Sequence, residues 1–108
     1  MTVDRIEEAL VALRDGRVVD GYRCVGLVFS DNLLTRSIGE VEEAEEHKVA
    51  SRAVLDKQRS VLRLYYDYER DDAPRARVTI LDCGSIKGIE VYSRSDHRSK
   101  ESPVVEIV

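Results

Sequence analysis

The stretch "RVVDGYRCVGLVF" constrains the fold more than any other part of the chain. An Asp-Gly pair between two runs of β-prone residues is the strongest short-range signal for a β-hairpin. It predicts a short strand at 17–19, a turn at Asp20 and Gly21, and a long strand at 22–30.

The segment before this hairpin, "TVDRIEEALVALRDG", predicts an amphipathic helix. Thr2 is placed to cap its first turn, acidic residues follow, and Gly16 stands just past its end. Residues 24–29 of the long strand are almost continuously apolar. We therefore expect that strand to be central and covered on both faces, with Gly26 marking a bulge or a close approach by this helix.

The period changes at "SIGEVEEAEEHKVASRAVLDKQ", which predicts a second helix over residues 38–58. Ser37 and Glu40 have the spacing of a capping box, carboxylates crowd the first two turns, and basic residues follow. This charge order suits the helix dipole. The apolar side is narrow and made mostly of small residues, so one side should lie on a sheet while most of the helix faces water.

The run "VLRLYYDYE", residues 61–69, alternates between apolar and polar positions. It favours a strand with Tyr66 and Tyr68 on the core side. The same residues also fit a continuation of the second helix, and periodicity alone leaves this open. Short turns connect the run to expected strands at 76–83 and 86–93, which predicts a three-stranded antiparallel meander.

Together these elements predict one α+β domain over residues 1–108, since this length allows one hydrophobic core. Two helices should pack on an antiparallel sheet of four to six strands, in the order α-β-β-α-β-β-β-β. A polar loop at 93–103 should be mobile, and "VVEIV" at 104–108 should form a last strand. Such a short strand must dock on an edge of its own sheet or of a neighbour's, which favours a homodimer.

Charge and hydropathy exclude some classes of function. The net charge is −4, and residues 1–58 carry the whole excess, because residues 59–108 hold equal numbers of acids and bases. Nucleic-acid binding needs clustered Lys and Arg and is disfavoured. No apolar run is long enough to span a membrane, and the acidic start "MTVDRIEEAL" is unlike a secretory signal. We expect a soluble cytoplasmic protein.

Few residues have the surroundings that catalysis or metal binding needs. Cys24 and Cys83 stand in apolar runs and are expected as small buried hydrophobes, not as a disulfide. His47 and His97 lack the spacing of metal ligands. A nucleophilic pair of Cys83 and His97 would need a third, orienting group. "CGSIKG" joins two strands and lacks the spacing of a phosphate-binding loop. The sequence thus predicts no catalytic residue, metal or cofactor.

A row of carboxylates is the sharpest surface feature, although charge runs usually serve solubility alone. It would complement a basic surface on a partner. Tyr65 and Tyr92 lie outside the predicted core and could contribute to a protein interface, where tyrosine is common. The predicted partner-binding residues are Glu42, Glu43, Glu45, Glu46, Tyr65 and Tyr92.

These features predict a small non-enzymatic interaction protein, such as an inhibitor or immunity-type protein, that binds a protein with a basic surface. Two alternatives stay open. One is a small-ligand-binding or enzymatic domain with a pocket between helix and sheet, for which few polar core residues are available. The other is a self-assembling structural subunit that uses an exposed sheet edge or the last strand.

Overall fold

The computed structural model describes residues 1–42, 44, 48–70, 73–96 and 102–108, and of 67–70 and 73–76 the backbone only. This part of the chain forms one α-helix, nine strands and a short 3-10 turn. In chain order they are α1 Val3–Asp15, β1 Val18–Val19, β2 Tyr22–Ser30, β3 Thr35–Gly39, β4 Val49–Ala50, β5 Arg52–Asp56, β6 Val61–Arg70, β7 Ala73–Asp82, η2 Cys83–Ser85, β8 Gly88–Arg94 and β9 Val104–Ile107.

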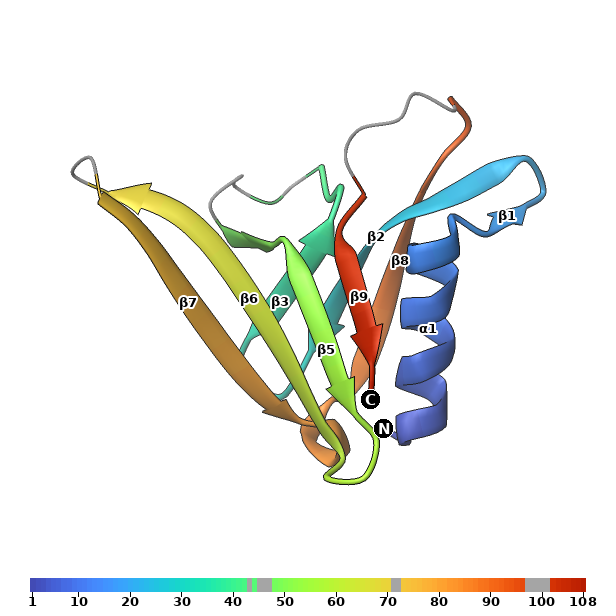
Figure 1. Ribbon diagram of the computed structural model, residues 1–108. Coiled ribbons are helices and arrows are strands. Elements are labelled where there is room, and N and C mark those ends of the chain that lie inside the picture. Colours follow the sequence, from blue (N-terminus) through green and yellow to red (C-terminus); the bar gives the residue numbers. More distant parts are fainter. Residues whose placement is uncertain (43, 45–47, 71–72, 97–101) are drawn as a thin grey trace.

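The strands form two sheets. In sheet A, β2 is central: it pairs antiparallel with β1, β3 and β8, and β3 pairs in parallel with β4. Sheet B has the order β7-β6-β5-β9, with β5 and β9 parallel and the other pairs antiparallel. The chain passes from sheet A to sheet B at Ser51, returns to sheet A between β7 and β8, and passes to sheet B again between β8 and β9. Figure 1 shows sheet B in front of sheet A, with α1 beside β9 and β8, both of which it contacts.

The hydrophobic core lies between the two sheets and α1. We call the side of each sheet that faces this core its inner face. The helix contributes one stripe, β5, β6 and β9 contribute buried side chains, and Leu81 of β7 is partly buried against the cluster. The largest fully buried side chains are Phe29, Ile6, Leu10, Leu27, Ile38, Leu55, Leu62, Leu64 and Ile86.

The first thirty residues fold as the sequence predicts. The Thr2 side chain accepts a hydrogen bond from the Arg5 amide at the start of α1, and Gly16 ends the helix with a left-handed φ of 60°. Asp20 and Gly21 both have positive φ, as the tightest hairpin turn requires. β2 is buried over six consecutive residues, which confirms the prediction of a central strand covered on both faces.

The predicted second helix over residues 38–58 is wrong, and so is the prediction of two helices packed on one antiparallel sheet. β3, β4 and β5 occupy this stretch. Burial gives one reason: Ala53, Val54 and Leu55 are consecutive and are 0%, 3% and 0% exposed. Consecutive residues point to different sides of a helix, so a helix with one solvated side could not bury all three. A strand paired with β6 and β9 can.

A contact between two glycines gives the second reason. Gly26 of β2 is paired with Gly39 of β3. A Cβ atom on Gly26 would overlap the backbone of Glu40, and one on Gly39 would overlap the carbonyl oxygen of Val25. Gly39 also has a φ of 81°, which other residues rarely adopt. The close approach predicted at Gly26 is therefore made by Glu40 and not by α1, whereas the bulge is confirmed by a register shift.

The predicted meander is half correct. Residues 61–69 lie in β6, so the strand alternative is confirmed over a helical continuation, and β6 pairs antiparallel with β7 as expected. The predicted pairing of 76–83 with 86–93 is wrong, because β8 pairs with β2 in the other sheet. In "CGSIKG" the Asp82 carboxylate accepts from the Gly84 amide at 3.0 Å, and the resulting 3-10 turn redirects the chain.

The last strand docks on its own chain. β9 pairs in parallel with β5, and Val105 is buried in the core. This removes the reason for which the sequence favoured a homodimer. Of the predicted mobile loop at 93–103, residues 97–101 lie outside the described part of the chain.

Candidate functional site

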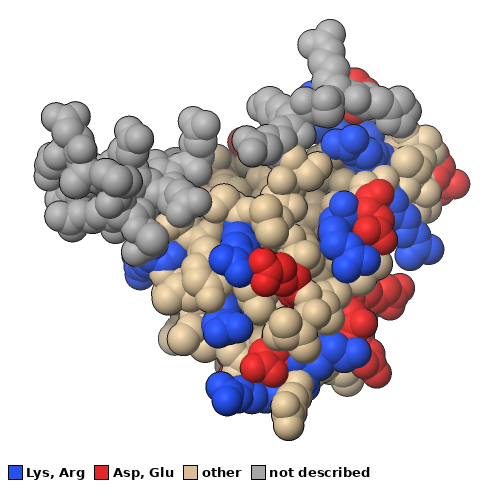
Figure 2. Space-filling view, viewed as in Figure 1, with Lys and Arg blue, Asp and Glu red and all other residues tan. Residues whose placement is uncertain are grey.

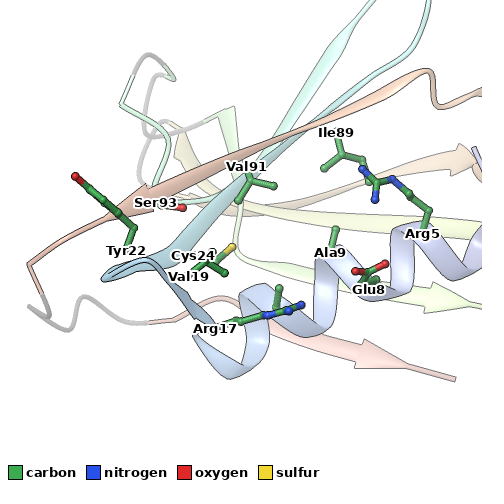
Figure 3. A pocket seen from close by; sticks show the side chains of 11 residues that line it. Arg5, Glu8, Ala9, Arg17, Val19, Tyr22, Cys24, Ile89, Val91 and Ser93 are labelled. Atoms are coloured by element: carbon green, nitrogen blue, oxygen red, sulfur yellow. The ribbon is translucent and has the colours of Figure 1, made fainter.

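A groove of about 260 Å³ runs between α1, the β1–β2 hairpin and β8 (Figure 3). Its floor is the inner face of sheet A where α1 does not cover it, with Ile89, Val91 and Ser93 contributed by β8. Its wall is one flank of α1, where Ala9 and Ala12 stand one turn apart. Because alanine is small, the wall leaves space in front of the β8 side chains.

Exposed apolar side chains surround the groove. Val19, Tyr22 and Val91 are 56%, 54% and 56% exposed, although all three lie on ordered strands. Contiguous apolar surface with a polar rim is typical of interaction sites, whereas single exposed apolar residues need no explanation. The clustering at one groove is therefore the informative observation.

The charged residues at the rim have no side-chain partners among the described residues. Arg5, Glu8 and Arg17 are exposed, and no side-chain hydrogen bond or ion pair reaches them from the described residues. Elsewhere on α1, by contrast, Glu7 pairs with Lys57 at 2.9 Å. In Figure 3, Arg5 and Glu8 lie at the Ile89 end of the groove, and Arg17 lies toward the other end.

The outer edge of β8 borders this groove. β8 is seven residues long, and within the described ranges no strand pairs with it on the side away from β2. An unpaired edge presents free N–H and C=O groups that can accept another strand, and most proteins protect long edges with proline, lysine or a bulge. β7, one of the two edge strands of sheet B, contains Pro74, whereas the β8 sequence "GIEVYSR" contains neither proline nor lysine.

Cys24 lies at the floor of the groove and is 6% exposed. Burial raises the pKa of its thiol above the ordinary value, and burial likewise raises the pKa of Cys83. Both cysteines are free and buried, as the sequence predicts. A raised pKa keeps a thiol protonated, and the thiolate is the reactive form, so Cys24 is suited to packing and poorly suited to nucleophilic attack. No metal-binding group of side chains occurs among the residues described.

The predicted partner-binding residues that the structure describes lie in two other places. Glu42 and Tyr92 line a second hollow, of about 1090 Å³, at the end of β3 and β8. The Arg94 side chain also lines this hollow. Its guanidinium already donates hydrogen bonds to the carboxylates of Glu40 at 2.6 Å and Asp96 at 2.8 Å. The predictions for Glu43, Glu45, Glu46, His47 and His97 fall outside the described residues.

Tyr65 lies on the outer face of sheet B, and Tyr66 faces the core, as the alternating pattern predicts. The Arg52 guanidinium lies 5.1 Å from the centre of the Tyr65 ring and also pairs with Glu106 at 2.8 Å. Figure 2 shows positive and negative side chains interspersed over the face of the molecule that carries sheet B. On this surface the Arg52 and Glu106 side chains pair with each other, and neither positive nor negative charge predominates.

Sequence reasoning missed the groove. Part of the groove can be found in the sequence. Ala9 and Ala12 have the spacing of one side of a helix, and Ile89, Val91 and Ser93 are alternate residues of a strand, so each set shares a face. The groove also requires that β8 pair with β2 and leave its other edge free. The predicted meander placed β8 beside β7, where no groove against α1 would exist.

No known protein-family model matches the chain, and neither does any curated protein or solved structure. Over the described residues, no helix is long and apolar enough to cross a membrane.

Proposed function

We propose that the protein is a small, non-enzymatic interaction domain that acts in the cytoplasm and binds an extended segment of another protein at the edge of β8, over the α1–β8 groove. One observation carries this proposal. The long edge strand without proline or lysine is the same strand whose inner face forms the floor of an exposed apolar groove. Strand addition to such an edge combines main-chain hydrogen bonds with side-chain pockets.

The groove supports this function better than it supports an enzyme or a small-ligand binder. Its volume of about 260 Å³ lies below the ~300–1,000 Å³ usual for small-molecule sites. Its ionisable side chains are two arginines, one glutamate, Tyr22 and the protonated Cys24, which supply no carboxylate or histidine pair for acid–base chemistry. The groove is large enough for a few side chains of a peptide, and the edge beside it satisfies the peptide backbone.

A second candidate surface is the hollow that contains Glu42 and Tyr92. The two residues were predicted independently as partner-binding residues, and both line this hollow. We propose it as the place where a basic protein surface would dock, in the manner of an inhibitor or immunity-type protein. Substitution of Glu42 by Lys together with Tyr92 by Ala would then abolish binding of such a partner, while the α1–β8 groove keeps its own ligands.

Selection of peptides from a random displayed library against the full-length protein tests the main proposal. Val91→Arg places a charge on the groove floor, and Val78→Arg is its matched control, because Val78 is a similarly exposed valine on β7. Peptides selected on the wild type should lose at least about tenfold in affinity for the Val91→Arg variant, since charge burial at an interface core is strongly unfavourable. They should bind Val78→Arg unchanged.

The proposal is wrong if the selected peptides do not distinguish the two variants, or if none is enriched. The native mass of the protein is measured alongside. If the protein is a homodimer, we expect the two copies to pair through the free edge of β8. Val91→Arg should then dissociate the dimer, whereas Val78→Arg should not.

A further inference from the structure

We infer that the protein binds a phosphate group between Arg36 of β3 and Arg77 of β7, with the hydroxyl of Tyr66 on β6 as a third donor. The three residues lie where sheet A and sheet B face each other, at the border of the hydrophobic core. None of them lines the α1–β8 groove, so this inference does not depend on the proposed function.

Strand register places all three side chains on the inner faces of the sheets. Arg36 is paired with Phe29 and stands two residues before Ile38, and both of these belong to the core. Residues directly opposite one another share a face of the sheet, and so do alternate residues of one strand. Tyr66 also belongs to the core, and it is paired with Arg77. Arg36 therefore points toward sheet B, whereas Tyr66 and Arg77 point toward sheet A.

Two of these side chains carry buried polar atoms that lack a partner. Arg36 Nε and the Tyr66 hydroxyl are buried, and neither forms a hydrogen bond with any described residue. Arg23 Nε and Arg63 Nε are in the same situation, so one such atom alone is no sign of a site. Arg36 and Tyr66 differ because they stand on inner faces that oppose each other. An acceptor bound between them would satisfy two buried donors at once.

The charges around Tyr66 favour an anion as that acceptor. Neither Arg36 nor Arg77 has an ion-pair or hydrogen-bond partner within the described part of the chain. Burial raises the pKa of Tyr66, and the positive charges of Arg36 and Arg77 oppose this rise. Both guanidinium groups thus lie close enough to act on the hydroxyl, because the interaction between charged groups weakens with distance. No described carboxylate acts on it.

One carboxylate lies near the edge of this site. The pKa of Asp31 is lowered by hydrogen bonds from the amides of Leu33 and Leu34, at 2.8 and 2.7 Å, and further by the charge of Arg36. The two amides hold Asp31 at the turn between β2 and β3, and it forms no ion pair with Arg36. Two arginines and one carboxylate leave a positive excess among the described side chains, which attracts anions.

The donor set suits phosphate better than a carboxylate. A guanidinium is a planar fork, and one such fork can take up both oxygens of a carboxylate. A phosphate group has more acceptor oxygens, so it can bind two arginines from different sheets together with a hydroxyl. Arg77 is exposed and Arg36 is partly buried, so the ligand would enter from the β7 side. Its contact with the Tyr66 hydroxyl requires the arginine side chains to rotate, as side chains at binding sites commonly do.

Titration of the full, isotopically labelled chain with inorganic phosphate, at constant pH and ionic strength, tests the inference by NMR. The amide signals of Arg36, Tyr66 and Arg77 should shift and reach saturation. Arg36→Gln should weaken binding about tenfold or more, because it removes partly buried charged donors. Arg77→Gln should weaken it about two- to fivefold, since that position is exposed. Tyr66→Phe should weaken it about two- to tenfold through the loss of one hydrogen bond.

Arg63→Gln is the matched control. Its Nε atom is likewise buried without a partner among the described residues, but Arg63 stands between Leu62 and Leu64 on β6 and so lies on the outer face of sheet B. This variant should bind phosphate as the wild type does. Arg36→Lys keeps the charge and loses the fork, so its affinity should lie between those of the wild type and Arg36→Gln. The dispersion of the amide signals checks that each variant is folded.

Two further ligands complete the test. Acetate should bind at least about fivefold more weakly than phosphate, since it cannot satisfy two arginine forks and a hydroxyl. Glycerol phosphate distinguishes the source of the phosphate group. Tighter binding of glycerol phosphate supports the site and identifies an organic phosphate as its ligand, whereas tighter binding of inorganic phosphate supports it with the free ion.

Three results would overturn the inference. In the first, phosphate does not shift the signals of β3, β6 and β7 in a saturable way. In the second, Arg63→Gln loses as much affinity as Arg36→Gln, which would mean that phosphate responds only to the overall charge of the protein. In the third, acetate binds as tightly as phosphate.

Discussion

The outer face of sheet B and the α1–β8 groove expose similar apolar side chains. Val78 and Ile80 are 45% and 64% exposed on β7, and Val91 is 56% exposed on β8. The neighbouring groups differ. On sheet B, Arg52 contacts the Tyr65 ring and a carboxylate of the adjacent strand. At the groove, by contrast, Arg17 has no ion-pair partner within the described part of the chain.

This difference teaches that apolar exposure alone does not identify a binding surface. One face of an antiparallel sheet is commonly solvated, and cross-strand pairs stabilise it without any partner. The groove combines exposed apolar area with charged side chains that have no ion-pair partner among the described residues and with a strand that pairs on one side only within those residues. Five predictions test this contrast, starting with the largest expected effect.

The groove keeps its shape only while β2 is held against β3. Gly39→Ala should lower the free energy of unfolding by about 3 kcal/mol or more, because the added Cβ overlaps the Val25 carbonyl oxygen and φ is positive. Gly88→Ala is the control, since no heavy atom of the described residues outside 87–89 lies within 4 Å of its Cβ position. It should change stability by less than about 0.5 kcal/mol in urea unfolding. Similar losses in both variants would contradict the glycine contact.

A buried polar group that makes no hydrogen bond should lower the stability of the folded protein. The Tyr66 hydroxyl is buried and has no hydrogen-bond partner among the described residues, and the residue is 7% exposed. Tyr66→Phe should therefore leave stability unchanged or raise it by up to about 1 kcal/mol. Tyr65→Phe is the matched control and should be neutral. A loss above about 1 kcal/mol for Tyr66→Phe would reveal a hydrogen bond that the structure does not show.

The same variant predicts a pH dependence. Burial raises the pKa of Tyr66 above its ordinary value of 10.0. Above that pH the unfolded chain ionises this group while the folded chain does not, so its contribution to stability is complete below pH 10 and is lost as pH rises toward the folded pKa. The wild type should lose stability more steeply than Tyr66→Phe in this range. Parallel curves in urea unfolding would count against burial as the cause.

Charged residues on the two surfaces should differ in their effect on folding. Arg52→Ala should lower stability by about 0.5–1 kcal/mol, since it removes the contact with Tyr65 and an exposed ion pair. Arg17→Ala should have no measurable effect, because no described residue forms a hydrogen bond or ion pair with its guanidinium. Equal losses would mean that Arg17 serves the fold and not a ligand.

The smallest effect is expected on thiol reactivity. Raised pKa values should make alkylation of both cysteines slow in the folded protein at neutral pH. Cys24 lines the groove and Cys83 does not, so a bound peptide should slow modification of Cys24 further, by less than about tenfold. Mass spectrometry of the Cys83→Ser and Cys24→Ser variants measures the two rates. Protection of Cys83 alone would place the peptide elsewhere.

The sequence predicted those elements whose signals are local. A cap at Thr2, a left-handed end at Gly16 and the Asp20-Gly21 turn each act within a few residues, so α1, β1 and β2 lie where expected. Alternation in residues 61–69 identified β6 and placed Tyr66 toward the core.

The rest depends on contacts between distant residues. The stretch after Ser37 satisfies the local rules of a helix start, yet residues 35–39 pair with β2 through the glycine contact, and tertiary structure overrides local propensity. The groove could not be predicted for the same reason. Its free edge exists because the turn at Asp82 sends β8 to β2, and alternation in β8 is equally compatible with either neighbour.

The contact between α1 and β9 joins the earliest and latest elements of the described chain. During synthesis, the side of the helix that faces β9 has no cover until Ile107 has left the ribosome. At about 5–20 residues per second, this interval lasts roughly 5–20 s. Sheet B is likewise incomplete until then, because β9 pairs in parallel with β5 across a long chain separation. A nascent chain stalled before β9 would therefore expose an apolar helix side and an open strand, and would depend on chaperones to stay free of aggregation.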